Sequence, residues 1–285
     1  MARRTGILAA IAALVSGCSA TAALNALVPA TTYEGREGVS YGSGPRQMLD
    51  VYQPLPGKAA APPIVVFFYG GNWESGERAN YRFVGEFLAA SGAIAVIPDY
   101  RLYPQVRYPD FLKDCAAAVA WAFANARALG GDPARIYVMG HSAGAYNAAM
   151  MALDPRWLGA QREQLAGFVG IAGPYDFLPI ENPATQRAFS WPNTPRDSQP
   201  VEYVSPKAPR TLLIAANKDN LVNPVRNTGG LAQRLKAAGV DTTVRLMEGV
   251  NHVTVLAAVA APLKFLAPVR EEVLAFLGLP TASAK

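Results

Sequence analysis

The chain of 285 residues has little cysteine and little histidine, with two residues of each. The two cysteines, Cys18 and Cys115, cannot build a disulfide framework or a cysteine metal site. Cys115 stands alone among alanines in a helical stretch, where a thiol is most simply a small buried apolar side chain. Since no cluster of metal-ligating residue types is present in the sequence either, we expect no metal and no cofactor.

An excess of charge of one sign is also missing. The 26 basic and 21 acidic residues give a formal net charge of +5, and no basic block is interleaved with aromatic residues. This pattern does not favour a nucleic-acid partner. The sequence has no internal repeat, and 51% of its residues are hydrophobic, which is enough to bury one full core. We therefore expect one domain, over residues 39–285.

No apolar run is long enough to span a bilayer, which needs about 20 residues. The longest, residues 6–15, follows Arg3 and Arg4, and this pattern predicts a signal peptide over residues 1–17. Residues 15–18, Val-Ser-Gly-Cys, resemble the lipobox of bacterial lipoproteins. The resemblance implies acylation of Cys18 and a cell-envelope protein facing the periplasm or exterior. Residues 18–38 are mostly small and polar and contain glycine, so we expect them to form a tether. Cleavage at a neighbouring small residue, giving a secreted soluble protein, stays open.

Apolar runs and helical patterns alternate along the rest of the chain. An unbroken apolar run at 63–69 is typical of a central strand covered on both faces. Strands are predicted at 39–42, 47–52, 63–69, 93–97, 135–139, 167–171, 211–216 and 242–247, and helices at 81–90, 110–129, 143–152 and 226–238. This alternation predicts an α/β fold, with a mostly parallel sheet and helices on both faces.

A proline-rich segment, residues 173–209, interrupts the alternation. It is too long for a simple turn, and we expect it to form a short cap over the edge where the strands end. Three of its aromatic side chains are candidates for the wall of a substrate pocket: Tyr175, Phe177 and Trp191. A long surface loop without contact to substrate is the alternative.

The most informative stretch is Gly-His-Ser-Ala-Gly at residues 140–144, which fits the G-x-S-x-G pattern. It follows an apolar strand and precedes a helical run, so Ser142 lies at a strand-to-helix turn. Such a turn exposes the serine hydroxyl and places it near the positive end of the helix. We therefore predict that Ser142 is a nucleophile.

A serine nucleophile needs a base, and the base needs an acid that orients it. His141 adjoins Ser142 and its side chain should leave the turn in another direction, so His252, in a loop after a strand, is the predicted base. Asp219 follows the neighbouring strand and is the predicted acid. Asp176, after the preceding strand, is the alternative acid.

An oxyanion formed at Ser142 needs backbone N–H groups aimed at it. Ala143 supplies one, and the loop of Gly70, Gly71 and Asn72 supplies the others, because glycine lets the backbone approach a substrate closely. Trp73, next in this loop, either lines the substrate pocket or packs in the core.

Together these motifs resemble a known family. Residues 68–73 (Phe-Tyr-Gly-Gly-Asn-Trp), residues 99–102 (Asp-Tyr-Arg-Leu), the elbow at 140–144, Asp219 and His252 are similar to the α/β-hydrolase carboxylesterases related to hormone-sensitive lipase and kynurenine formamidase. The family usually has histidine where this chain has Tyr69, at the base of the loop.

The resemblance implies an α/β-hydrolase fold, a scaffold role for residues 99–102, and a serine hydrolase that needs no cofactor. Its substrate would be a small carboxylic ester, cleaved through an acyl-enzyme intermediate. An amidase or formamidase with the same triad, and a non-catalytic binding protein of this fold, are the alternatives.

Overall fold

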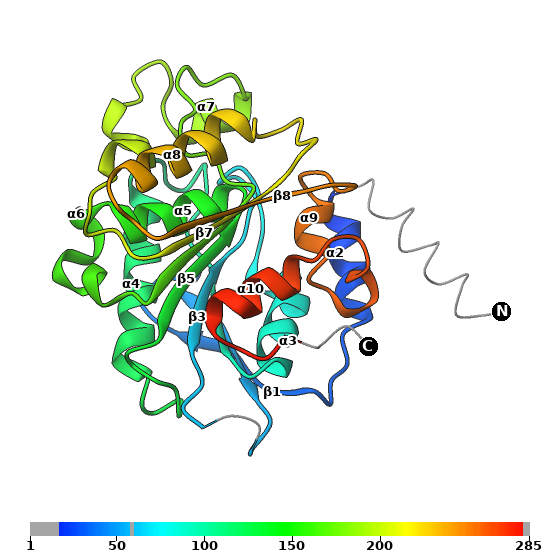
Figure 1. The fold of residues 1–285 in the computed structure, drawn as a ribbon. Coiled ribbons are helices and arrows are strands. Elements are labelled where there is room, and N and C mark those ends of the chain that lie inside the picture. Colours follow the sequence, from blue (N-terminus) through cyan, green and yellow to red (C-terminus); the bar gives the residue numbers. More distant parts are fainter. Residues whose placement is uncertain (1–16, 58–59, 282–285) are drawn as a thin grey trace.

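The computed structural model describes residues 17–57 and 60–281. The predicted signal peptide therefore lies outside the described residues, except for Gly17. The strands are β1 (Tyr33–Ser40), β2 (Met48–Pro54), β3 (Ile64–Phe68), β4 (Ile94–Pro98), β5 (Ile136–His141), β6 (Gly167–Ile171), β7 (Thr211–Ala216) and β8 (Thr242–Met247). All eight belong to one sheet (Figure 1).

The order of strands across the sheet is β1-β2-β4-β3-β5-β6-β7-β8. Only β2 runs antiparallel to its neighbours, and every other pair is parallel. The mostly parallel sheet predicted from the sequence is thus confirmed. Because β5, β7 and β8 run in one direction, the loops that follow them meet at the same edge of the sheet.

The middle of the sheet is the core of the protein. Every residue of β3, β4, β5, β6 and β7 is buried, as continuous apolar runs require. Helices cover both faces: α4 and α5 lie on one, and α3 and α10 on the other (Figure 1). The sheet therefore holds its end loops on a rigid, doubly covered scaffold.

The helices include four that the sequence predicted and several that it did not. They are α2 (Gly17–Ala26), α3 (Arg82–Ala90), α4 (Asp110–Asn125), α5 (Ala143–Leu153), α6 (Pro155–Leu158), α7 (Pro183–Ala188), α8 (Gly230–Ala237), α9 (Thr254–Ala257) and α10 (Val269–Leu277). Within the described ranges, each falls short of the length and apolarity that a bilayer crossing requires. Cys115 is fully buried in α4, and burial raises the pKa of its thiol well above the ordinary value.

The N-terminal part of the chain differs from the expected tether over 18–38. Residues 17–26 form helix α2, and β1 begins at residue 33 instead of 39 and pairs with β2. Helix α2 is held in place because Leu24 is buried in the core and the side chain of Asn25 accepts a hydrogen bond from the N–H of Phe83, at 3.2 Å. The segment is therefore part of the folded domain.

The proline-rich segment 173–209 contains α7 and two single 3₁₀ turns, η3 (Arg196–Ser198) and η4 (Pro200–Tyr203). It leaves the sheet after β6 and returns at β7, near the edge at which the parallel strands end. In Figure 1 it lies over that end of the molecule, beside α8.

Candidate active site

Ser142 occupies a strained turn between β5 and α5. Its backbone angles are φ 54° and ψ −126°, a combination that costs a non-glycine residue about 1–3 kcal/mol. The turn is held because the N–H of Ser142 donates to the carbonyl of Ile171, at the end of β6, over 2.9 Å. The strain places the side chain at the edge of the sheet, directly before the first turn of α5.

The two glycines of the motif are required by close backbone contacts. A Cβ atom on Gly140 would lie 2.1 Å from the carbonyl oxygen of Gly144. A Cβ on Gly144 would lie 2.0 Å from the carbonyl oxygen of Phe68, in β3. Any larger residue at either place would push α5 away from the strands, so the pattern has a direct steric cause.

The structure brings together the three side chains selected from the sequence. Nε2 of His252 lies 2.8 Å from Oγ of Ser142, and Nδ1 of His252 lies 2.7 Å from Oδ2 of Asp219. With the proton on Nδ1, His252 donates to the carboxylate and accepts from the serine hydroxyl. This is the geometry in which a base can take the proton of a nucleophile.

The loop after β7 holds the carboxylate of Asp219 in place for its contact with His252. Its Oδ1 accepts hydrogen bonds from the N–H groups of Leu221 and Val222, at 2.8 and 2.9 Å. Burial raises the pKa of Asp219, but the hydrogen bond from His252 and these two N–H groups outweigh burial, so its net pKa is lowered. The carboxylate therefore stays charged beside the imidazole.

The two alternatives for the triad lie elsewhere. Asp176 forms an ion pair with Arg226, at 3.1 Å, instead of contacting His252. His141 turns away from the serine hydroxyl, as expected, and contacts the backbone of His252.

The predicted oxyanion loop has an unusual backbone. Gly71, Asn72 and Trp73 have φ values of 126°, 53° and 59°, all in the left-handed region. A Cβ on Gly71 would lie 2.2 Å from the carbonyl oxygen of Ser75, so glycine is needed there. Gly70, Gly71 and Asn72 line the same cavity as Ser142, and so does Ala143, whose N–H begins α5 and has no acceptor within the helix.

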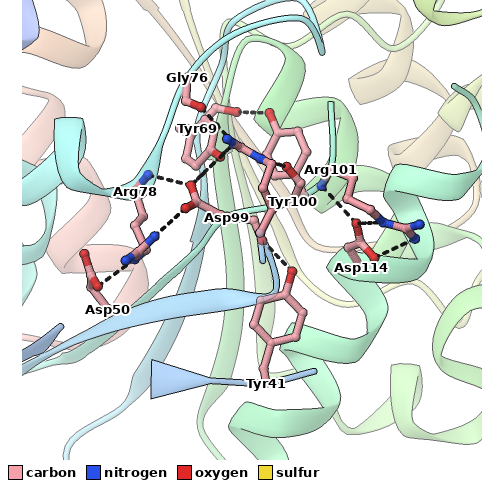
Figure 2. A network of polar contacts seen from close by, with 10 residues as sticks. Tyr41, Asp50, Tyr69, Gly76, Arg78, Asp99, Tyr100, Arg101 and Asp114 are labelled. Atoms are coloured by element: carbon pink, nitrogen blue, oxygen red, sulfur yellow. Dashed lines mark hydrogen bonds and ion pairs between the residues drawn. The ribbon is translucent and has the colours of Figure 1, made fainter. Parts of the chain in front are cut away.

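Tyr69, at the place where the family usually has histidine, anchors this loop to the residue after β4. Its hydroxyl donates to Oδ1 of Asp99 over 2.7 Å, and its carbonyl accepts from the hydroxyl of Tyr100 over 2.8 Å (Figure 2). Burial raises the pKa of Tyr69 well above its ordinary value, so the hydroxyl keeps its proton.

Two arginines complete this network. Arg78 pairs with Asp99 at 2.5 Å (Figure 2). Arg46 donates to the Tyr69 hydroxyl at 2.8 Å and to the Gly76 carbonyl at 2.9 Å. Arg46 thus links both ends of the loop between Tyr69 and Gly76. The local sequence gave no signal for Arg46, because it lies more than 20 residues from every partner in the loop.

The candidate site opens into a cavity of about 930 Å³. Of the four predicted pocket residues, Trp73 and Phe177 line it. Trp73 also packs in the core, where its Nε1–H donates to Asn147 over 3.0 Å. The prediction that Tyr175 and Trp191 line the pocket was wrong. Tyr175 is buried against Phe168, and Trp191 packs on the core away from the cavity.

The walls of the cavity differ in character. One side is apolar and is formed by Leu24 of α2, Phe83 of α3 and Leu256 of α9. Elsewhere, the proline-rich segment 173–209 adds the apolar Phe177 and Ile180 as well as the polar Glu181, and Arg226 of the π-helical turn η5 (Val225–Gly229) adds a positive charge. In the part of the chain that the structure describes, no group of three or more His, Cys, Asp or Glu side chains is arranged to hold a metal ion.

Comparisons with known proteins identify esterases that are similar to this chain. The sequence profile of the family described as BD-FAE matches residues 49–235. Esterase LipC of Mycobacterium tuberculosis is 33% identical over 228 residues, which cover 72% of this chain and 56% of that protein. A probable isoprenylcysteine alpha-carbonyl methylesterase, ICMEL1 of Arabidopsis thaliana, is 28% identical over 247 residues, covering 76% of this chain and 50% of that protein. The chain thus spans about half the length of these curated relatives.

Solved structures show the same fold. Esterase B of Lactobacillus rhamnosis superposes with a TM-score of 0.78 and 19% identity, covering 96% of each chain. Apo esterase 2 of Thermogutta terrifontis gives a TM-score of 0.71 and 22% identity, covering 89% of this chain and 98% of that chain. The α/β-hydrolase fold expected from the sequence is confirmed.

Proposed function

This chain belongs to the BD-FAE family, and on that premise we propose that it is a serine hydrolase that cleaves carboxylic esters. The observation that carries the proposal is the chain of two hydrogen bonds from Ser142 through His252 to Asp219, at 2.8 and 2.7 Å. The esterase names of the relatives support an ester as the substrate.

The proposed reaction has two halves. His252 takes the proton of Ser142 while the serine oxygen attacks the ester carbonyl, and the N–H groups of Gly71, Asn72 and Ala143 hold the oxyanion. The proton then passes from His252 to the alcohol oxygen as the alcohol leaves. Water attacks the acyl-enzyme with His252 again as base, and the acid is released with Ser142 restored.

Turnover of p-nitrophenyl acetate and butyrate by the wild type and Ser142→Ala tests this proposal. The variant should lose at least about 10³-fold in kcat, because it lacks the hydroxyl that hydrogen-bonds to Nε2 of His252. Ser91→Ala, at the end of α3, is the matched control and should keep the wild-type rate. Equal rates for wild type and Ser142→Ala would refute it, and faster turnover of N-formyl or aryl-amide substrates would favour an amidase instead.

We also propose that Cys18 is acylated and anchors the protein in the bacterial cell envelope. The support is the lipobox-like sequence at residues 15–18 behind the apolar stretch 6–15. Growth with an alkyne-tagged fatty acid should label the wild type and leave Cys18→Ala unlabelled. A wild-type chain that is unlabelled and found in the aqueous fraction would instead favour the secreted form.

A further inference from the structure

Helix α2 is a wall of the candidate active site. Thr21 and Leu24 line the cavity, and Leu24 is only 4% exposed. Asn25 fixes the helix, since its side-chain amide donates to the carbonyl of Ala79 over 2.6 Å and accepts from the N–H of Phe83 over 3.2 Å. In Figure 1 the helix lies beside α9, which follows the loop of His252. The start of α2 is therefore held close to the cavity.

This arrangement limits how far the proposed lipid anchor can be from the cavity. Cys18 belongs to α2 and precedes Thr21 by three residues and Leu24 by six. With a rise of about 1.5 Å per residue, those separations are roughly 5 and 9 Å along the helix axis. Because α2 is docked and is not a loose tether, the backbone at Cys18 is within about 10 Å of the cavity wall along that axis, and the proposed anchor would hold the cavity close to the bilayer.

The loops around the same cavity expose apolar side chains. Leu221, two residues after Asp219, is 72% exposed, and Val225 is 80% exposed. Val253, next to His252, is 44% exposed. Leu221 and Val253 line the cavity, and Val225 precedes the lining residue Arg226.

We propose that this face, formed by residues 218–225, Val253 and the first turn of α2, lies on the surface of a lipid bilayer. The enzyme would then take amphiphilic esters from the membrane, with the acyl chains admitted along the apolar wall of Leu24, Phe83 and Leu256. This inference rests on the proposed ester hydrolysis and on the proposed anchor at Cys18. It identifies the substrate class as esters that partition into lipid.

A fluorescent label tests the docking without any activity measurement. The full chain is purified from membranes and reconstituted in vesicles of phosphatidylethanolamine and phosphatidylglycerol, with nitrobenzoxadiazole on Val225→Cys. Cys115 is buried and does not compete for the label. Ala134→Cys is the matched control, since Ala134 is exposed before β5 at the opposite edge of the sheet. The label at 225 should be blue-shifted and protected from aqueous dithionite, and the label at 134 should be quenched. Equal quenching at both sites would overturn the proposal.

An activity measurement then tests the substrate class. In the same vesicles, Val225→Asp should lower turnover of a long-chain ester by at least about fivefold, because a charge opposes burial in the interface. Turnover of soluble p-nitrophenyl butyrate should not change, and Ala134→Asp should change neither rate. If Val225→Asp matches Ala134→Asp on both esters, the membrane-substrate inference fails. If the label at 225 is protected but the wild type cleaves no ester, the docking stands and the proposed function fails.

Discussion

His141 holds the backbone of His252. Its Nε2–H donates to the carbonyl oxygen of His252 over 2.8 Å, and the two rings lie 5.0 Å apart. A carbonyl can only accept, so this nitrogen of His141 carries a proton. Burial, and then the neighbouring His252, lower the pKa of His141 to about 3. His141 is therefore neutral near pH 7, and its hydrogen bond holds the backbone of the candidate base, His252.

This contact predicts a positioning role for His141. His141→Leu removes the donor and should lower kcat by about tenfold with little change in KM, because a loosened imidazole is less well aligned with Ser142. His141→Gln keeps a side-chain N–H and should recover most of kcat. Steady-state kinetics on p-nitrophenyl butyrate check this. Identical loss in both variants would show that His141 serves packing only.

The same residue predicts how stability depends on pH. The pKa of His141 is about 3 in the folded chain and 6.5 as its ordinary value, so between these limits the unfolded chain binds the extra proton. Stability should then fall as pH drops, by about 2 kcal/mol between pH 7 and 5. Asp219 does not contribute there: its pKa is lowered, so its stabilisation is lost only below its ordinary value of 3.8.

Urea unfolding at pH 7 and pH 5 measures this effect, with His141→Gln as the comparison. The variant has no titrating group at this site and should lose about 2 kcal/mol less than the wild type over the same interval. Parallel losses in the two proteins would contradict the lowered pKa.

The two candidate acids predict opposite outcomes. Asp219→Asn should lower kcat by about 10³–10⁴-fold, because the amide no longer selects the imidazole tautomer that accepts from Ser142. Asp176→Asn should keep kcat within about threefold, since it breaks only a half-exposed ion pair with Arg226. Single-turnover measurements of both variants decide between them. The reverse ranking would move the triad to Asp176.

The fold was predictable where burial leaves a strong pattern. The runs at 63–69 and 93–97 became β3 and β4 because strands covered on both faces must be apolar throughout. Strand β1 was missed over most of its length, since it is an edge strand with mainly exposed polar side chains. Helix α2 was also missed, because a stretch of small residues is typical of a tether. What holds this helix is the burial of Leu24 and the hydrogen bond of Asn25 with Phe83, which lies far along the chain.

The site was predictable where one short motif imposes geometry. The pattern at 140–144 and the order of the strands selected Ser142, Asp219 and His252, which the structure brings together, while their catalytic roles stay predictions. Composition could not tell which aromatic rings of the cap face the cavity, because Tyr175 and Phe177 are two residues apart and only Phe177 lines it. Asp99 and Arg46 support the oxyanion loop through hydrogen bonds to the Tyr69 hydroxyl. These residues lie far from Tyr69 in the sequence, so no local pattern predicts the contacts.

Two tyrosines, Tyr69 and Tyr41, donate hydrogen bonds to Asp99, and we expect only Tyr69 to affect catalysis as well as stability. Tyr69→Phe removes the hydroxyl that donates to Asp99 and accepts from Arg46, and should cost about 1–2 kcal/mol of stability. Since Tyr69 leads directly into Gly70 and Gly71, kcat should also fall by about tenfold as the oxyanion donors lose their alignment. Tyr41→Phe is the matched control, because the Tyr41 hydroxyl donates to the backbone carbonyl of Asp99, away from that loop.

Urea unfolding and kcat, measured on both variants, test whether this network supports the oxyanion loop. Tyr41→Phe should lose stability by a similar amount, about 1 kcal/mol, and keep the wild-type kcat. Tyr69→Phe should lose both, with KM for p-nitrophenyl acetate changing little, because the N–H groups of Gly71 and Asn72 act mainly on the developing oxyanion. If the two variants lose stability equally and both keep kcat, the phenol of Tyr69 is a packing element and the loop holds its shape without it.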